Sequence, residues 1–367
     1  MLPNPQPYFA NLPDPRRETK NKLHKLEDIV MIVLCAVLSG IEDWVGMEIF
    51  AEEREGWFRG FLELPNGIPS HDTQSDVMGR INPLSFREAF LAWVEEALPS
   101  LSGRHVAVDG KTLRGSRVGE KAVHLMSAFA CEARWVLGPV AVDGKSNEIR
   151  AIPDLLEVLE LRGATVSIDA MGCQKEIAAQ IVEGDADYVL ALKDNHPTLH
   201  EDVRLWLDTE ATAGRLPVLE TLEKDHGRLE VRRYRLSSAL DWLDGRQDWR
   251  GLRAVGRVEA ERHMNGKVSL EQRYFLCSFD DLSRFATVVR GHWRIENSQH
   301  WVLDVVFGED DHRTRMNHAP ENLALIRRTA LNLVRQNGHS KESLKRRRLR
   351  ASLNDTCRWQ LLTGAQT

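Results

Sequence analysis

The chain has 367 residues, 42% of them hydrophobic, which is enough for at least one large core and for two or three structural units. The 49 Lys and Arg against 54 Asp and Glu leave a formal net charge of −5, so total charge neither predicts nor excludes a nucleic-acid partner. The five cysteines are scattered without a CxxC pair, which argues against a disulfide scaffold or structural zinc and favours reduced thiols in the cytoplasm. The longest apolar run, 29–38, is too short to cross a membrane, and the polar, Pro-rich N-terminus predicts no signal peptide.

The first hundred residues predict an arm followed by a helical unit. Residues 1–20 contain five prolines, which is typical of an extended arm. In 21–100, apolar residues recur with helical spacing from Leu26 to Leu38, and further helices are expected at 41–54, at 57–62, from Thr73 and at 85–98. A turn at 65–67 precedes a helix that Ser70 or Asp72 can cap. This pattern fits a DNA-reading helix-turn-helix, but it fits a small helical bundle equally well.

The remainder of the chain predicts a mixed α/β core with a β-rich insertion. In 101–216, strands are expected at 104–109, 122–131, 135–142, 164–169 and 187–192, with helices at 153–161 and 175–182 between the last three. This order predicts a mixed sheet covered by helices. Residues 217–279 return to β character and interrupt the alternation as an insertion would. Residues 280–340 resume the core with a helix from 281 and another at 320–336.

The C-terminal segment 341–367 is a basic tail. Between residues 327 and 350 nine residues are basic and only Glu342 is acidic. Such a tail can be a solvated arm, but it also offers a salt-dependent contact for a polyanion. We expect it to bind DNA.

Two aspartates stand at the ends of expected strands. They are Asp109 in AVDGKTLRG and Asp169 in SIDAMGCQ. Each could merely cap the next turn. The pentapeptide AVDGK recurs at 141–145 and makes Asp143 a rival to Asp109. If the first three strands form an antiparallel meander and the fourth pairs with the first, Asp109 lies roughly 4.8 Å from Asp169 and Asp143 on the order of 14 Å away.

Two carboxylates at such a short distance repel each other unless a cation lies between them. Hard divalent cations such as Mg²⁺ accept carboxylate oxygens, and a third acid would complete a two-metal site with ions roughly 4 Å apart. One helical face in the segment HWRIENSQHWVLDVVFGED carries Glu296, His300 and Asp304. Glu296 is our candidate third ligand. Asp304 and Glu309 are alternatives, and Glu296 could instead pair with a neighbouring arginine on a solvated face.

The chain resembles the H-repeat-associated transposases, DDE enzymes of bacterial insertion sequences, from about residue 14 to beyond 349. Besides the segments above, the resemblance is carried by VDGKSNEIRAIPDLLE, DYVLALKDNH, HGRLEVRR and APENLALIRRTALNL. It implies a ribonuclease-H-like core with strand order three-two-one-four-five, an associated N-terminal domain and a DDE triad holding two Mg²⁺ or Mn²⁺ ions. By motif, the triad is Asp109, Asp169 and Glu296. The Tyr that related enzymes place seven residues before the glutamate is here Val289, and the Arg that they place four residues before it is absent.

The resemblance also implies a substrate and partners. We expect cleavage at the terminal inverted repeats of an element and strand transfer into target DNA, by at least a dimer, in the cytoplasm at the nucleoid, without a membrane or small-molecule cofactor. A DNA-binding relative without turnover and a metal-dependent nuclease without strand transfer are the alternatives. Trp293 and Trp301 favour a core position over base stacking. The residues expected to contact DNA are Lys111, Arg114, Lys193, Arg290, Trp293, Arg294, Arg346, Arg347 and Arg348.

Overall fold

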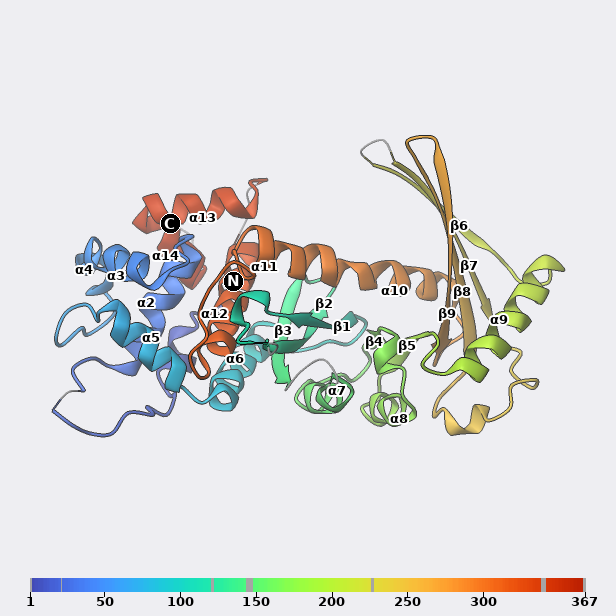
Figure 1. Cartoon of the computed structure of the whole chain (residues 1–367), viewed down its shortest axis with the longest axis horizontal. Coiled ribbons are helices and arrows are strands. Elements are labelled where there is room, and N and C mark those ends of the chain that lie inside the picture. Colours follow the sequence, from blue (N-terminus) through green and yellow to red (C-terminus); the bar gives the residue numbers. More distant parts are fainter. Residues whose placement is uncertain are drawn as a thin grey trace.

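The computed structural model describes residues 2–20, 22–119, 122–142, 148–225, 228–337 and 341–365. Helices from both ends of the chain gather at one end of the molecule, a helix-covered sheet forms the middle, and a long β-ribbon projects at the other end (Figure 1). Asp143, the rival to Asp109, lies outside the described residues.

The N-terminal unit is built around one helix that is buried on nearly all sides. Twelve residues of α2 are buried, as expected for a helix that is apolar all round. The helices of this unit are α1 (Gln6–Phe9), α2 (Leu26–Leu38), α3 (Trp44–Glu52), α4 (Glu55–Phe58), α5 (His71–Arg80) and α6 (Pro83–Ala97). Ser70 caps α5 by accepting a hydrogen bond from the backbone N–H of Thr73. Asp72 and Asp76 stand toward the outer side of α5, where acids disfavour contact with DNA.

The N-terminal arm packs against the helices instead of extending. The ring of Phe9, in α1, contacts Phe86 edge-on at 5.2 Å between centroids. The carbonyl of Pro3 accepts a 2.8 Å hydrogen bond from Nε1 of Trp93. Apolar residues among the prolines therefore anchor the segment, and the expectation of an extended arm is corrected.

The central sheet has the predicted order. Its five core strands are β1 (His105–Thr112), β2 (His124–Ala130), β3 (Trp135–Val142), β4 (Thr165–Ile168) and β5 (Asp187–Leu192). They stand in the order β3-β2-β1-β4-β5, with β1, β2 and β3 antiparallel and β4 parallel to both β1 and β5. The prediction of a mixed α/β sheet flanked by helices is confirmed.

The β-rich segment extends this sheet as a four-stranded ribbon. Its strands are β6 (Leu219–Asp225), β7 (Arg228–Ser237), β8 (Ala254–Met264) and β9 (Lys267–Cys277). β9 pairs with β5 only from Val189 to Leu192, so most of the ribbon projects beyond the core sheet (Figure 1). This pairing covers the edge of β5, which would otherwise expose unpaired backbone groups.

Three helices follow strands of the core. They are α7 (Glu148–Glu157), α8 (Lys175–Glu183) and α9 (Pro197–Thr212). α7 begins before Pro153, so the prediction of a helix starting at this proline is wrong. The neighbouring apolar residues Ile152 and Leu155 are buried and hold the helix on the sheet despite the missing N–H.

The C-terminal part joins the sheet to the N-terminal helices. Its elements are α10 (Leu282–Arg294), the π-helical segment η5 (Ile295–His300), α11 (Trp301–Val305), α12 (Ala319–Gln336), α13 (Leu344–Leu353) and α14 (Asp355–Thr363). Asn332 in α12 exchanges two 2.9 Å hydrogen bonds with the backbone of Val136 in β3. Within the described ranges, no helix has both the length and the apolar character needed to cross a bilayer.

The basic tail forms two packed helices, so the alternative of a solvated arm is wrong. Arg348 is only 4% exposed, and its Nη2 donates a 2.7 Å hydrogen bond to the carbonyl of Val37 at the end of α2 and also binds Glu42. Arg358 is fully buried and binds Ser39 at 3.2 Å. These guanidinium groups hold the tail on α2. Arg348 is therefore withdrawn as a DNA contact.

Candidate active site

Strands β1 and β4 bring two aspartates to the same place in the sheet. Val108 and Ile168 are paired residues of the two parallel strands, and Asp109 and Asp169 follow them directly. Each aspartate also has the local turn role that its sequence allowed. Oδ1 of Asp109 accepts from the N–H of Gly110 at 2.9 Å, and Oδ1 of Asp169 accepts from the N–H of Met171 at 3.2 Å.

Helix α10 packs on the sheet and leads into the segment η5, which places Glu296 beside Asp109. The ring of Phe285 packs edge-on against Phe275 of β9 at 5.5 Å, which seats the helix over the sheet. Gly291 permits a close approach to β1, because a Cβ at this position would lie 2.6 Å from Nδ1 of His105. The chain then widens into the π-helical segment η5, a local geometry often found at functional sites.

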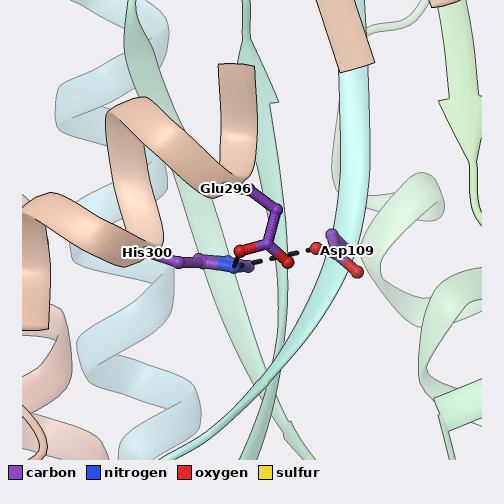
Figure 2. Close-up of side chains that lie close together, drawn as sticks. All are labelled: Asp109, Glu296 and His300. Carbon is purple, nitrogen blue, oxygen red and sulfur yellow. Dashed lines mark ion pairs between the residues drawn. The ribbon is translucent and has the colours of Figure 1, made fainter. Parts of the chain in front are cut away.

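Asp109, Glu296 and His300 point toward one another (Figure 2). Nδ1 of His300 lies 3.7 Å from Oδ2 of Asp109 and 3.6 Å from Oε2 of Glu296. One ligand atom from each of the three residues falls within 4.8 Å of the others, a spacing that could hold a metal ion. The sequence placed His300 on the face of Glu296 but assigned it no role. Its spacing of four residues from Glu296 was the signal available.

The two carboxylates have opposite proton affinities. Burial of Asp109, whose side chain is 16% exposed, raises its pKa to about 8, and the nearby Glu296 and Asp169 act in the same direction. The His300 ring lowers the pKa of Glu296 to about 2. Glu296 is 51% exposed and keeps more of its hydration. A proton shared by the pair therefore belongs to Asp109.

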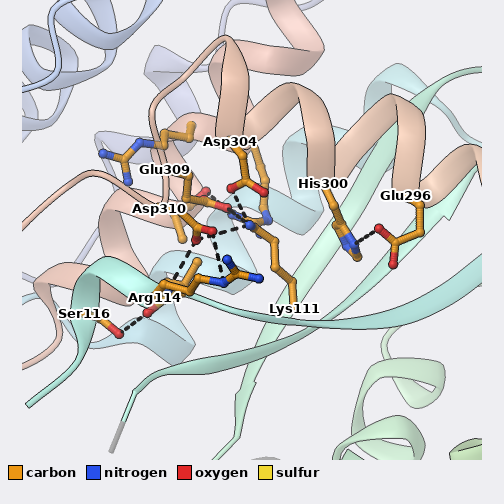
Figure 3. A network of polar contacts seen from close by, with 12 residues as sticks. Lys111, Arg114, Ser116, Glu296, His300, Asp304, Glu309 and Asp310 are labelled. Atoms are coloured by element: carbon orange, nitrogen blue, oxygen red, sulfur yellow. Dashed lines mark hydrogen bonds and ion pairs between the residues drawn. The ribbon is translucent and has the colours of Figure 1, made fainter. Parts of the chain in front are cut away.

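Lys111 and the acids after η5 form a separate ionic network (Figure 3). Nζ of Lys111 lies 2.5 Å from Oδ1 of Asp304 and 3.5 Å from Oδ1 of Asp310. Glu309 pairs at 2.7 Å with Arg328 of α12, and neither side chain is exposed. Asp304 and Glu309 thus neutralise lysine and arginine in place of acting as the third ligand. Lys111 is buried in this network, so the expectation that it contacts DNA is wrong.

The other expected DNA contacts differ in accessibility. Arg290 binds both oxygens of Glu223 in β6 at 2.8 and 2.7 Å, which occupies its guanidinium edge. Nη1 of Arg347 donates to the carbonyl of Val334 at 2.9 Å. Those that remain exposed are Arg114, Lys193, Trp293, Arg294 and Arg346.

The expectation that both tryptophans of this region are core residues is wrong. Trp301 is 56% exposed and Trp293 is 39% exposed. The guanidinium of Arg273, from β9, stacks over the ring of Trp293 at 4.4 Å from its centroid. Trp293 is therefore supported by the ribbon and still open to solvent.

A chain of neutral polar groups lies between β1, β4 and α10. Nε2 of His105 is 2.6 Å from Oγ of Ser167, which is 2.7 Å from Nδ1 of His292. Burial lowers the pKa of His105 to about 3 and that of His292 to about 4. Both rings are therefore neutral near pH 7, and they tie α10 to the strands that carry the aspartates.

We expect these histidines to make stability depend on pH. In the unfolded chain a histidine takes up a proton near pH 6.5, but in the folded chain His105 and His292 do so only near pH 3 to 4. Between about pH 6.5 and pH 4 the unfolded state binds more protons, so the free energy of unfolding falls as pH falls, by up to about 1.4 kcal/mol per pH unit for each ring. Urea unfolding at a series of pH values measures this slope.

The control for this dependence is His105→Gln, which removes one titrating group. This variant should lower the slope of the unfolding free energy against pH by up to about 1.4 kcal/mol per pH unit, which is the contribution of one proton. The expected change in slope does not depend on how the substitution affects stability at pH 7. An unchanged slope would show that His105 does not contribute.

Family descriptions cover most of the chain. The description "Transposase DDE domain" matches residues 100–333, and "DDE_Tnp_1-associated" matches residues 7–94. The chain belongs to the DDE transposase family. Members of this family generally use divalent cations, and the acidic cluster with His300 is a possible site for one.

Three relatives match most of this chain, and two of them are named as putative transposases. "Uncharacterized protein in dhlA 3'region" of Xanthobacter autotrophicus is 50% identical over 76% of this chain and 95% of that protein. "Putative transposase YncI" of Escherichia coli O157:H7 is 39% identical over 95% of this chain and 92% of that protein. "H repeat-associated putative transposase YhhI" of Escherichia coli K12 is 35% identical over 98% of this chain and 97% of that protein. The predicted resemblance to H-repeat-associated transposases is confirmed.

Proposed function

We propose that this protein cleaves DNA at the ends of an insertion sequence and transfers the freed strand ends into target DNA. The observation that carries the proposal is the meeting of Asp109 and Glu296, which are far apart in the chain, beside the strand-end residue Asp169. Three acids gathered beside the adjacent strands β1 and β4 of a ribonuclease-H-like sheet suit an in-line displacement at phosphorus assisted by divalent cations.

The donor set fits the two Mg²⁺ or Mn²⁺ ions that we propose as cofactors. The high proton affinity of Asp109 results from burial and from neighbouring carboxylates, and a cation would relieve both effects. Carboxylate oxygens suit either ion, and the imidazole of His300 is better matched to Mn²⁺. The half-exposed Glu296 leaves an open side for a phosphate. Bound cations would stabilise the charge that develops on the phosphate oxygens.

The protein's own groups would act by holding and orienting the reactants. The cation ligands would be Asp109, Asp169 and Glu296. Asp109 would release its proton when the cations bind. His300 would keep Glu296 ionised and directed toward β1, since its Nδ1 lies within 3.7 Å of a carboxylate oxygen of both Asp109 and Glu296. The π-helical turn and the close packing at Gly291 would hold this constellation rigid, which favours catalysis.

We propose that the DNA partner comprises the terminal inverted repeats and the target. The exposed groups proposed to contact it are Arg114, Lys193, Trp293, Arg294 and Arg346. Lys193 directly follows β5, whose carboxyl end lies beside that of β4. Joining two ends requires at least a dimer on DNA. These substrates would place the protein in the cytoplasm at the nucleoid.

The test is an end-cleavage assay on DNA that carries the sequences flanking the gene. The purified full chain is incubated with this DNA and either Mg²⁺ or Mn²⁺, and sequencing gels locate nicks while a second plasmid reports joined products. We expect metal-dependent cuts at repeat ends and joined products. A scrambled-end DNA and EDTA are the controls.

Two other outcomes correspond to the alternatives. Binding of the flanking DNA without nicking in either metal would indicate a DNA-binding relative without turnover. This alternative has some support, because Val289 stands where related enzymes have a tyrosine and is buried in the core. Cut ends without joined products would indicate a nuclease.

A further inference from the structure

A large groove separates the N-terminal helices from the edge of the catalytic sheet. It has a volume of about 1370 Å³, and its walls come from the α5–α6 junction, the ends of β1, β2 and β3, α7 and the start of α12. Both family-matched segments, 7–94 and 100–333, therefore contribute to it. None of the residues proposed above as ligands or DNA contacts lines this groove.

Arginines dominate the charge of the groove. Its lining includes Arg80, Arg87, Arg117, Arg150 and Arg315, against two acids, in a chain whose net charge is −5. Throughout the described part of the chain, only Arg80 among these five forms an ion pair, at 2.8 Å with Asp76. Nε of Arg87 is buried without a hydrogen-bond partner among the described residues. Elsewhere, by contrast, arginines such as Arg233 and Arg257 bind several carboxylates.

Position and size indicate what the groove binds. Thr112 lines it and lies three residues beyond Asp109 on β1, or about 10 Å along the strand. Small-molecule pockets are usually about 300–1,000 Å³ and mostly apolar. A wider groove whose guanidinium groups, apart from that of Arg80, have no carboxylate partner among the described residues suits a polymer with regularly spaced negative charges.

We propose that this groove binds the phosphate backbone of duplex DNA on one side of the bond that is cut at Asp109. The inference rests on the proposed function for its substrate. It adds a surface made jointly by the N-terminal helices and the sheet edge. The associated domain would then act by completing a backbone clamp, without reading bases through α5.

The test measures DNA binding by a triple variant of the full chain, Arg117→Gln, Arg150→Gln and Arg315→Gln. All three side chains are exposed, so the fold should persist, and thermal unfolding checks this. Fluorescence anisotropy with a labelled 40-base-pair duplex from the gene's flank, in EDTA, gives Kd across a salt series. We expect Kd to rise at least about tenfold near 0.1 M salt. The slope of log Kd against log salt should fall by roughly 0.9 for each lost phosphate contact.

Two matched variants control for charge and for position. Arg162→Gln, Arg246→Gln and Arg250→Gln removes three charges that are also exposed but lie outside the groove, and it should leave Kd within about twofold. Substituting lysine at the three groove positions keeps the charge and should retain most of the binding.

The outcomes separate this inference from the proposed function. A groove variant that matches the wild type in Kd and salt slope overturns the inference, even if the wild type cleaves DNA. A wild type that binds through the groove without cleaving supports the inference and contradicts the proposed catalysis. An RNA hairpin that displaces the duplex at lower concentration than unlabelled duplex would overturn the assignment to DNA.

Discussion

Replacing Asp109 with asparagine should abolish metal-dependent DNA cleavage. Asparagine keeps the shape of the side chain but removes the charge that a divalent cation requires. Loss of an outer-shell partner of a metal ligand already costs about 10–100-fold, so loss of a ligand should cost more than about 100-fold. Binding to flanking DNA should persist, because Asp109 is largely buried and its carboxylate does not attract phosphate groups.

A second readout for Asp109→Asn does not depend on turnover. A cation that binds only the folded protein raises the melting temperature. Mn²⁺ should therefore stabilise the wild type and leave Asp109→Asn unchanged. Without metal, the variant should be at least as stable as the wild type, because a buried carboxyl beside other carboxylates is replaced by a neutral amide.

Asp143→Asn is the matched control, since the same pentapeptide surrounds both aspartates. It should cleave DNA like the wild type. Loss of cleavage in Asp143→Asn together with normal cleavage in Asp109→Asn would contradict the assignment of the first ligand.

Removing one partner of the Glu309–Arg328 pair should lower the free energy of unfolding more than removing one partner of an exposed ion pair. Both side chains are completely buried, and their atoms are 2.7 Å apart. Glu309→Ala leaves the guanidinium buried without its carboxylate, which typically costs about 3–5 kcal/mol of the free energy of unfolding. Urea unfolding followed by tryptophan fluorescence measures the loss.

The reason for this cost predicts the behaviour of a double variant. Glu309→Leu with Arg328→Met removes both charges and should recover most of the stability, because burial of an unpaired charge is the main cost. As a surface control, Glu55→Ala breaks an exposed pair with Arg59 and should cost less than about 1 kcal/mol. Equal losses for the surface and buried pairs would show that the buried pair contributes no more than the surface pair.

The same pair connects stability with the active site. Glu309 also lies 3.8 Å from Nζ of Lys111, which stands on β1 two residues after Asp109. Loosening the loop after α11 should therefore disturb the strand that carries Asp109. A residual cleavage defect in the folded double variant would report this second role.

Local sequence patterns located the strands of the core, but the predicted end of the first strand at Asp109 is wrong, because β1 continues to Thr112 in its pairing with β2. The predicted limits of β3 and β5 agree with the structure, because buried strands read as continuous apolar runs between turns. The pairing of β1 with β4, which places Asp109 beside Asp169, came instead from the strand order that the family resemblance implies. Buried apolar side chains near Pro153 and at Phe9 outweigh the local effect of the prolines, so both segments are helical and packed.

The partners of charged residues depended on contacts that are distant in sequence. Lys111 meets Asp304, Arg290 meets Glu223, and Arg348 meets the carbonyl of Val37, which lies 311 residues away. A run of basic residues has the same sequence pattern whether its side chains face solvent or bind a buried carbonyl. Local sequence pattern thus indicated the two aspartates and the elements of the sheet. Tertiary packing decided which cations remain available to DNA, because a charge is neutralised by whatever the fold brings within a few ångströms.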